Sequence, residues 1–340
     1  MKIKQFKFIR EADMRILYIP IIPLVVLSIH AQELPHLSSL VHTFSIVARD
    51  SVTGEMGVAV QSHWFSVGST VTWAEAGVGA IATQSLVNPA FGPDGLKLLK
   101  EGKTAEQTLQ ILIEGDEGRD YRQLAIVDAL GNVAAWTGPK CIAAAGHICG
   151  NNYSVQANMM LNNQVWPAMD KAFKTARGNL TERLMLALEA AQQAGGDIRG
   201  KQSAAMLIVK GKPAGKIWED RIVDLRVEDH HEPLVELRRL LQVDAAYKHM
   251  NAGDLAIEKN DVETALREYG LAEKLFPDNL EMQYWHAVSL ANLGKMDESL
   301  KIFRKIFKHD SNWRTLTKRI YDVGLLNLEP KQLQKIIELK

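Results

Sequence analysis

Apolar residues follow two different periods in turn along residues 43–242. Short β-rich runs separated by turn residues predict strands, and longer runs with apolar residues every three or four positions predict helices. Asp50, Ser51 and Gly54 separate the first two β-rich runs, which predicts a hairpin. The predicted strands are 43–49, 56–62, 69–74, 78–84, 121–128, 133–138, 153–159, 203–210 and 221–227. The predicted helices are 92–102, 103–115, 164–176, 181–196 and 233–241.

Capping residues mark the ends of two of these helices. Thr104 and Gln107 have the spacing of a capping box, so a helix is expected to begin just after Thr104. Thr181 is the expected N-cap of the helix at 181–196, and Gly195 is its expected stop.

The order of the elements indicates the fold class. Hairpins and helix pairs follow one another in blocks, without the regular strand and helix alternation of a doubly wound parallel sheet. The runs "GVGAIAT" and "AAMLIV" are apolar on both faces, as expected for sheets that are covered on both sides. We therefore predict an α+β domain over 43–242, a four-layer αββα sandwich with two stacked antiparallel sheets between helical layers.

From residue 243 to 340 the pattern is purely helical and contains a repeat. Two segments superimpose at a shift of 34 residues, which pairs Ala265 with Ser299 and Tyr269 with Phe303. This period resembles the tetratricopeptide repeat, and Gly253 matches its conserved glycine. We expect an all-α tetratricopeptide-like region with a capping helix. It would dock a protein partner or, alternatively, cap or dimerise the main domain.

The segment before residue 43 has the pattern of a signal peptide. Basic residues precede an apolar run over 16–29, and Ala31 supplies the small residue before a cleavage site. The run is shorter than the roughly 20 residues of a membrane-spanning helix. Residues 1–31 are therefore predicted to be a signal peptide, with Met14 as an alternative start, and 32–42 a short leader or pro-segment. We expect an exported protein, periplasmic or secreted, with no membrane span after cleavage.

Composition and charge narrow the classes of partner. The chain has 340 residues, and its apolar content of 46% is enough for a sizeable core. Lysine plus arginine number 40, as do aspartate plus glutamate, so no net charge would attract nucleic acid. We expect a homo-oligomer that binds a small polar amide or peptide ligand.

Motifs of known chemistry are few. The HExxH, Walker and GxSxG patterns do not occur in the predicted mature sequence. Export would place Cys141 and Cys149 in an oxidising compartment, which favours a disulfide, and two buried thiols are the alternative. His147 lies between them, but one His and two Cys fall short of a four-ligand zinc site. We predict no metal and no cofactor.

Polar side chains gather where several predicted strands end. Because such positions have little packing reason to be polar, four polar strand ends suggest one shared pocket, although for each residue taken alone a turn or loop role is the favoured interpretation. The candidate substrate-binding residues at these ends are Gln61, Ser62, His63, Asn88, Gln156, Asn158, Arg199, Lys201 and Gln202.

Six stretches carry a resemblance to a known family. They are "HTFSIVARD", "GVAVQSHWFSVGS", "WAEAGVGAIATQSLVNPAFGPDGLKLL", "AGHICGNNYSVQANMM", "GGDIRGKQSAAMLIV" and "DLRVEDHHEPLVELRRL". Together they resemble the family called domain of unknown function 1028, which is placed in the N-terminal-nucleophile (Ntn) hydrolase fold. The resemblance covers about 41–241 and implies an αββα sandwich, but it implies no demonstrated substrate.

The resemblance also implies a role for Thr43. In Ntn hydrolases the nucleophile is the first residue of the first strand, freed by cleavage so that its own α-amino group is the general base. That role requires cleavage between His42 and Thr43. Glu75 falls near the position where proteasome-like members carry an activating lysine, and an acid cannot lower the pKa of the amine as a cation would. An oxyanion would be bound by three backbone amides, those of Thr83, Gln84 and Ser85.

Three functions remain open from the sequence. The main hypothesis is an exported Ntn-type amidohydrolase or peptidase in which Thr43 attacks an amide carbonyl. Glu75 is then expected to be one of the substrate-binding residues. The rival is a non-catalytic exported binding protein that captures a small polar ligand. A weaker third is a metal-dependent hydrolase using His63, His147 or His230.

Overall fold

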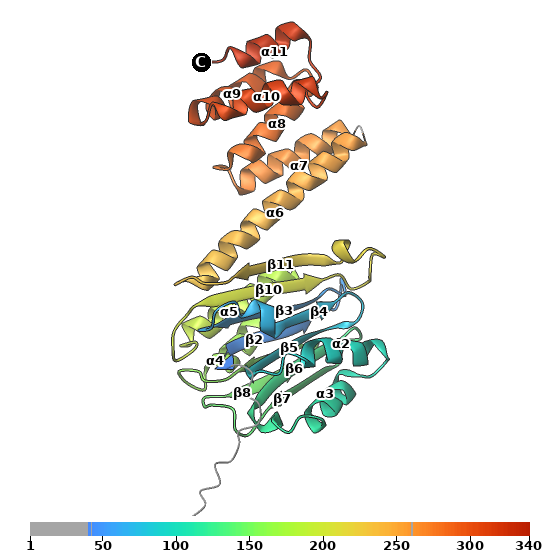
Figure 1. The fold of residues 1–340 in the computed structure, drawn as a ribbon, viewed down its shortest axis with the longest axis vertical. Helices are drawn as coiled ribbons and strands as arrows, with labels where there is room; N and C mark the ends of the chain where they lie inside the picture. The colour runs from blue at the N-terminus through green and yellow to red at the C-terminus, as the bar shows by residue number, and fades with distance from the viewer. Residues whose placement is uncertain (1–39, 42, 260) are drawn as a thin grey trace, which may run out of the picture. The chain divides into compact units, whose positions relative to one another are not determined.

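The computed structural model describes residues 40–41, 43–259 and 261–340 (Figure 1). Two antiparallel sheets are followed by a region of six helices, α6 to α11. The predicted signal peptide and leader lie outside the described residues, except for Leu40 and Val41. Among the residues described, no helix combines the length and apolar character needed to cross a membrane.

The first sheet has six strands in the order β11-β10-β3-β2-β9-β8. The predicted first hairpin is confirmed, because β2 (Thr43–Arg49) pairs antiparallel with β3 (Met56–Ser62). Asp50 holds the turn between them by accepting hydrogen bonds from two backbone N–H groups that follow it. The other strands of this sheet are β8 (Gly146–Gly150), β9 (Tyr153–Ala157), β10 (Ser203–Val209) and β11 (Arg221–Val227). The sequence pattern did not predict β8.

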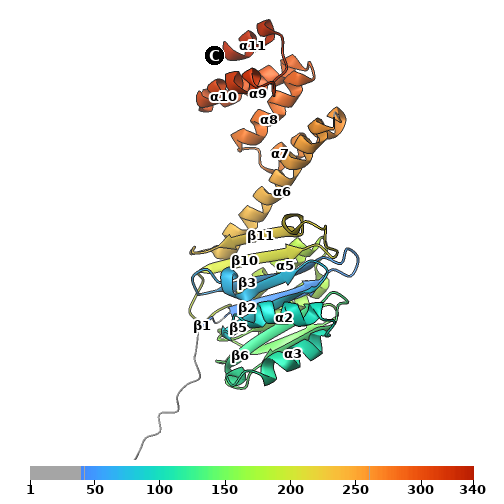
Figure 2. The ribbon, with the colours of Figure 1, turned by 45° about the vertical axis from the view of Figure 1, so that its right-hand side comes forward.

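The second sheet has five strands built around β5 (Gly79–Leu86). One edge of β5 pairs with β6 (Arg122–Asp128), and β6 pairs with β7 (Val133–Thr137). The opposite edge of β5 is shared by two short strands. β4 (Thr72–Glu75) pairs with its first half, and β1 (Leu40–Val41) pairs with its end (Figure 2). The predicted strand at 69–74 begins instead as a short helix, α1 (Gly68–Val71).

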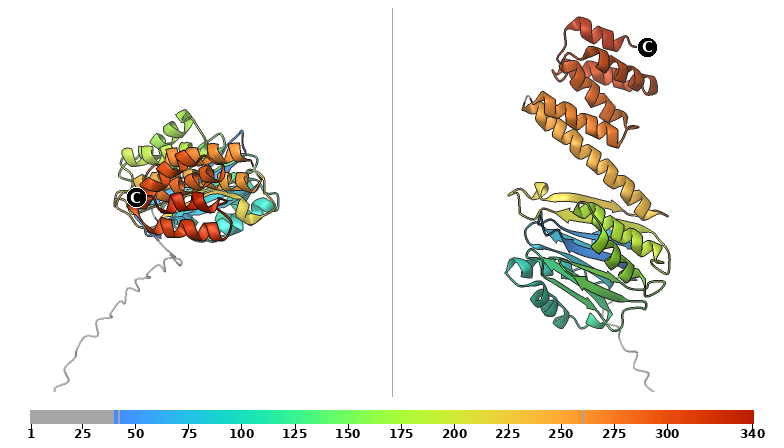
Figure 3. Two further views of the ribbon diagram at one scale, coloured as in Figure 1. Left: turned by 90° about the horizontal axis from the view of Figure 1, so that it is seen from above. Right: turned by 180° about the vertical axis from the view of Figure 1, so that it is seen from behind.

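A helix pair covers the outer face of each sheet. α2 (Phe91–Lys100) and α3 (Ala105–Glu114) pack on the five-stranded sheet. α4 (Val165–Thr175) and α5 (Leu180–Gln193) pack on the six-stranded sheet (Figure 3, right). Single 3-10 turns lie at Arg119–Tyr121 and Ile217–Glu219.

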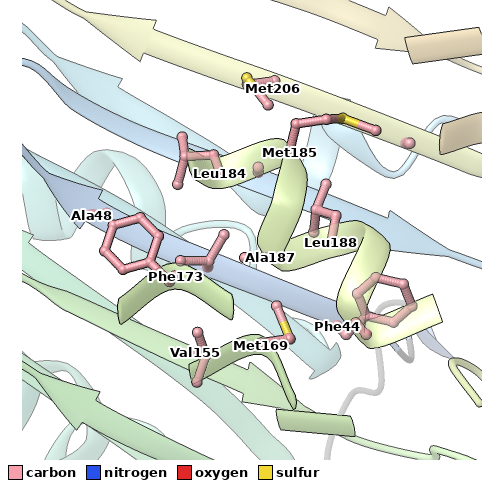
Figure 4. Close-up of a cluster of buried hydrophobic side chains, with 14 of the residues drawn as sticks. Phe44, Ala48, Val155, Met169, Phe173, Leu184, Met185, Ala187, Leu188 and Met206 are labelled. Carbon is pink, nitrogen blue, oxygen red and sulfur yellow. The ribbon is translucent and has the colours of Figure 1, made fainter. Parts of the chain in front are cut away.

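Period-two alternation in β2 separates its two faces. Phe44 and Ala48 point to the helices and pack with Leu184 and Leu188 of α5 (Figure 4). Val47 points the other way, into an apolar layer between the sheets. Full burial of a leucine of this kind contributes about 1.5–3 kcal/mol to the stability of the fold.

Two helix caps illustrate how local sequence sets the helix ends. The capping box predicted at Thr104 is confirmed, because its side chain accepts from the backbone N–H of Gln107 and the Gln107 side chain accepts in return. The predicted N-cap at Thr181 is wrong. α5 begins at Leu180, and its N-cap is Asn179, two residues before Thr181. The Asn179 side chain accepts from the backbone N–H of Glu182 at 2.9 Å.

The helical region begins with the 26-residue helix α6 (Pro233–Glu258). The predicted domain boundary at 242/243 lies inside this helix. Leu237 near its start belongs to the core under the six-stranded sheet, whereas Met250 packs with Tyr269 of the next helix. The remaining helices are α7 (Val262–Leu275), α8 (Leu280–Asn292), α9 (Met296–His309), α10 (Asn312–Asp322) and α11 (Pro330–Ile337).

Candidate functional site

The polar strand ends predicted from the sequence meet at one end of the sandwich, which we call the Thr43 end. In the six-stranded sheet, Thr43 at the start of β2 pairs with Ser62 at the end of β3, and Ser62 also pairs with Ser203 at the start of β10. In the five-stranded sheet, Ser85 near the end of β5 pairs with Arg122 at the start of β6. These pairings bring together residues that lie far apart in the sequence.

Thr43 is completely buried, with 0% of its surface exposed. Its side chain shares a face with that of Ser45, which reaches across to the other sheet, so both lie between the two sheets. The Thr43 carbonyl accepts hydrogen bonds from the backbone N–H of Asn158 at 3.1 Å and from Gln84 Nε2 at 3.1 Å. The Asn158 side-chain amide lies 3.5 Å from the same oxygen. Two side-chain amides therefore point at the head of β2.

Gln123 of β6 joins these amides in one buried network. Its Oε1 accepts from Gln84 Nε2 at 2.7 Å and from Asn158 Nδ2 at 2.9 Å. Its Nε2 donates to the Ala157 carbonyl at 2.9 Å and to Thr137 Oγ1 at 2.9 Å. Backbone carbonyls only accept, so these contacts fix which end of each side-chain amide carries the N–H groups.

A second arm of the network runs from Gln84 towards β8 and β9. Gln84 Oε1 accepts from the Ser45 hydroxyl at 2.5 Å, and Ser45 Oγ accepts from Gln156 Nε2 at 2.6 Å. Gln156 Oε1 accepts from the Ser154 hydroxyl at 3.0 Å, and Cys149 Sγ lies 3.8 Å from Ser154 Oγ. Every member of this arm is a neutral amide, hydroxyl or thiol.

The first arm of the network is the contact from Gln123 to Thr137, and it ends at a cleft of about 470 Å³. Thr137 Oγ1 lies 2.8 Å from His147 Nδ1, and both residues line the cleft together with Cys141. Burial lowers the pKa of His147, which favours the neutral imidazole. Burial also raises the pKa of Cys141, whose thiol donates to the Arg122 carbonyl at 3.3 Å. Both titratable groups in the cleft are therefore kept uncharged near neutral pH.

Comparison with known proteins identifies the family of this sandwich. A family model described as "Family of unknown function (DUF1028)" matches residues 43–237. The chain belongs to the DUF1028 family. A crystal structure of protein SPO2555 from Silicibacter pomeroyi, assigned to DUF1028, resembles the chain with a TM-score of 0.54 and 34% sequence identity. The similarity covers 59% of this chain and 85% of that one. No curated protein matches the sequence.

The DUF1028 region brings most of the predicted β5 and β9 residues to the Thr43 end. Gln156, Asn158 and Gln84 are part of the network. Ser85 has a left-handed backbone (φ 73°), and its buried hydroxyl lies beside the Cys141 thiol. The Thr83 hydroxyl donates to the Asn88 carbonyl, and the Asn88 side chain accepts from a backbone N–H two residues later. Asn88 therefore stabilises the turn that leads to α2.

Ser62 of β3 pairs with Thr43 and shares its face, whereas the other predicted residues from β3 and from the loop before β10 lie on the opposite face of the six-stranded sheet or at its rim. Gln61 neighbours Phe44 in the register, so its side chain faces the helices, where both amide atoms are buried without a partner among the described residues. The His63 backbone N–H donates to the buried carboxylate of Asp197, which also binds the Arg199 guanidinium at 2.7 Å. Towards the surface, the Lys201 ammonium binds Glu232.

A further predicted residue lies just beyond this group at the rim. The Gln202 side-chain amide donates to the Asp229 carboxylate at 3.2 Å.

Two predictions about the DUF1028 region, those for Glu75 and for the disulfide, need correction. Glu75 pairs with Gly79 at the start of β5, about 20 Å from the Thr43 end by strand rise, and its carboxylate binds Lys100 at 2.5 Å. Cys141 and Cys149 are free thiols, because their sulfur atoms bind the Arg122 carbonyl and the Ser154 hydroxyl respectively. No group of three or more His, Cys, Asp or Glu side chains that could hold a metal ion occurs within the described residues.

Sequence reasoning missed several members of the network. Ser45, Gln123, Thr137 and Ser154 lie inside β-rich runs, where each reads as one polar residue of a strand. The alternation along these strands was a usable signal. Each polar residue alternates with apolar residues that pack under the helices, so the polar residue itself must point to the opposite face of the sheet.

Proposed function

We propose that the protein is an exported Ntn-type amidohydrolase or peptidase that acts on a small amide or peptide. In this proposal the two helix-covered sheets are an Ntn αββα sandwich, and Thr43 is its nucleophile. The observation that supports it is the place where the chain changes sheets. β1 belongs to the five-stranded sheet and β2 to the six-stranded sheet, so the crossing falls immediately before Thr43.

Cleavage at that crossing would supply the groups that the reaction needs. The new α-amine takes the proton of the Thr43 hydroxyl while Oγ1 bonds to the substrate carbonyl carbon. The C–N bond of the substrate then breaks, and the leaving amine takes that proton. Water hydrolyses the resulting ester and restores the hydroxyl. The Gln84 and Asn158 side-chain amides donate to the Thr43 carbonyl and to Gln123 Oε1, so they hold the head of β2. The backbone amides of Thr83 to Ser85 are the candidate donors for the oxyanion.

The leader has a second role in this proposal. While β1 is paired with Ser85 and Leu86 it covers the edge of β5 beside Thr43, and Thr43 has no exposed surface. Removal of the leader would uncover that edge, including the backbone amides near Ser85 that were predicted from the sequence to bind the oxyanion. We therefore expect the uncleaved chain to be inactive.

Intact mass and N-terminal sequencing of the exported protein, combined with amide hydrolysis assays, test this function. We expect material that starts at Thr43 to hydrolyse amides, and Thr43→Ser to retain measurable activity. Thr43→Ala should lose at least roughly a thousandfold in kcat, as is usual for loss of a nucleophile. An ordinary α-amine has a pKa of roughly 7.7–8.0, so activity should rise through that range as the base loses its proton. Full activity in protein that begins at Gln32 would refute the free-amine mechanism.

A non-catalytic binding protein is the second candidate, and the complete burial of Thr43 favours it. In this case the uncleaved chain would bind its small polar ligand as well as any shortened form. For the helical region we propose a tetratricopeptide-like repeat that docks a protein partner. Gly253 supports this, because a Cβ at that position would come within 2.7 Å of the Tyr269 ring, as expected where two repeat helices pack closely.

A further inference from the structure

The cleft at the end of the first arm has an unusual lining. Three side chains carry its polar chemistry, those of Thr137, Cys141 and His147, and the rest of the lining consists of small residues. Those small residues are Gly138, Pro139, Ala143, Ala145 and Gly146. The lining includes no Asp, Glu, Lys or Arg side chain. A charged ligand would thus lose hydration here without gaining an ionic partner.

The hydrogen-bond network fixes the direction of the bonds in this cleft. Gln123 Nε2 has two N–H groups, and its two shorter contacts, both 2.9 Å, are with the Ala157 carbonyl and Thr137 Oγ1, while the Gly146 carbonyl lies farther away at 3.2 Å. Thr137 Oγ1 therefore acts as an acceptor towards Gln123, which leaves its own proton for His147 Nδ1 at 2.8 Å. A neutral imidazole that accepts at Nδ1 carries its proton on Nε2. The ring thus has one remaining N–H donor.

The cleft is connected to Thr43 through the hydrogen bonds of Gln123, and it also lies close to Thr43 in space. His147 is in β8, two strands from β2 in the same sheet, which corresponds to a separation on the order of 10 Å. His147 is also level with Gln156 and Ser45 in the register, two residues along from Thr43. A group bound in the cleft could therefore belong to the same small molecule as a group at the head of β2.

We propose that this cleft binds an uncharged polar group through a hydrogen bond from His147 Nε2–H to a carbonyl or hydroxyl oxygen. If Thr43 is the nucleophile proposed above, on which this step rests, the group is the part of the substrate about 10 Å from the scissile amide. The substrate class is then a small amide whose distal end is neutral and polar. Binding itself requires no chemistry at Thr43.

Three probes of almost identical shape and different charge test the proposal. They are acetamide, acetate and acetamidinium, each titrated into the full-length Thr43→Ala chain while the imidazole resonances of His147 are followed by NMR. We expect acetamide to shift these resonances saturably, with a dissociation constant on the order of millimolar for so small a ligand. Acetate and acetamidinium should bind at least tenfold more weakly. Equal binding of acetate, or no saturable shift with any probe, would overturn the proposal.

Substitutions separate the hydrogen bond from the shape of the cleft. His147→Phe keeps a planar ring without the donor, so acetamide binding, followed through the Cys141 and Gly146 resonances, should weaken at least tenfold. His231→Phe, outside the cleft, is the matched control and should leave binding unchanged. Unchanged binding in His147→Phe would refute the assigned donor. Binding is measured in Thr43→Ala, which cannot turn over substrate, and activity is measured separately in protein that starts at Thr43. If the first binds acetamide and the second hydrolyses no amide, the proposed function is refuted and the cleft assignment stands.

Discussion

Replacement of Gln123 tests whether the inter-sheet network holds the two sheets together. Gln123→Leu keeps nearly the same volume and removes five hydrogen-bond contacts, two accepted by Oε1 and three that share the two N–H groups of Nε2. At about 0.5–1.5 kcal/mol for each bond, the loss amounts to about 3–7 kcal/mol. The apolar leucine offsets about 1–2 kcal/mol of this by its burial. The expected net decrease in the free energy of unfolding is about 2–5 kcal/mol.

Urea unfolding and thermal unfolding followed by circular dichroism measure this effect. A decrease of 2–5 kcal/mol corresponds to a melting temperature lower by about 4–20 °C for a domain of this size. Gln110→Leu is the matched control, because Gln110 is an exposed glutamine on α3, and it should change stability by no more than about 0.5 kcal/mol. If Gln123→Leu were within about 1 kcal/mol of the native protein, the network would not contribute to stability as argued.

Gln123→Glu gives a second, pH-dependent readout of the same site. A carboxyl group at this buried position would face the carbonyl oxygens of Ala157 and Gly146, so its folded pKa should lie above the unfolded value of roughly 4.3. The folded state would then bind the proton more tightly than the unfolded state. Relative to the native protein, the variant should therefore be most stable at low pH and should lose stability as the pH rises above roughly 4.3. A pH-independent stability difference from the native protein would contradict this account.

Two further predictions concern the thiols and the cap of α5. Cys149 is exposed and Cys141 is partly buried, so Ellman's reagent should titrate two thiols in the denatured chain and react first with Cys149 in the folded chain. Because the pKa of both thiols is raised by burial, the reaction should accelerate only at alkaline pH, and a mass two units lower in the exported protein would contradict free thiols. Asn179→Ala should cost about 1 kcal/mol in urea unfolding, whereas Thr181→Ala should cost less than half of that, and the reverse order would restore Thr181 as the cap.

The fold class was largely predictable because its signals are local. The alternation in 43–49 and 56–62 and the turn residues between them are enough to define a hairpin, and the spacing of Thr104 and Gln107 is enough to define a cap. The missed strand Gly146–Gly150 has only five residues, a glycine at each end and Ile148 as its one β-branched residue, so it gives a weak strand signal. Its place in the sheet depends on pairing with β9.

The site was less predictable because it depends on which strand lies next to which. Gln123 reads as one polar residue in a strand, and only the stacking of the two sheets makes it the centre of a network. Glu75 was placed near Thr43 by counting residues along a hairpin. α1 takes up part of that segment, and β4 pairs with the first half of β5, so Glu75 lies at the far end. Counting residues cannot detect such a change in pairing.

The continuity of α6 sets a limit on how the chain can be shortened. A break between residues 242 and 243 would create two new helix ends, each with up to four backbone groups that lack a partner in the helix. It would also separate Leu237 from Met250, which belong to different apolar clusters. The similarity to DUF1028 ends at residue 237, more than five turns before the helix does. The end of the family match therefore falls inside a continuous helix, and a fragment designed to fold should retain the chain at least through Glu258.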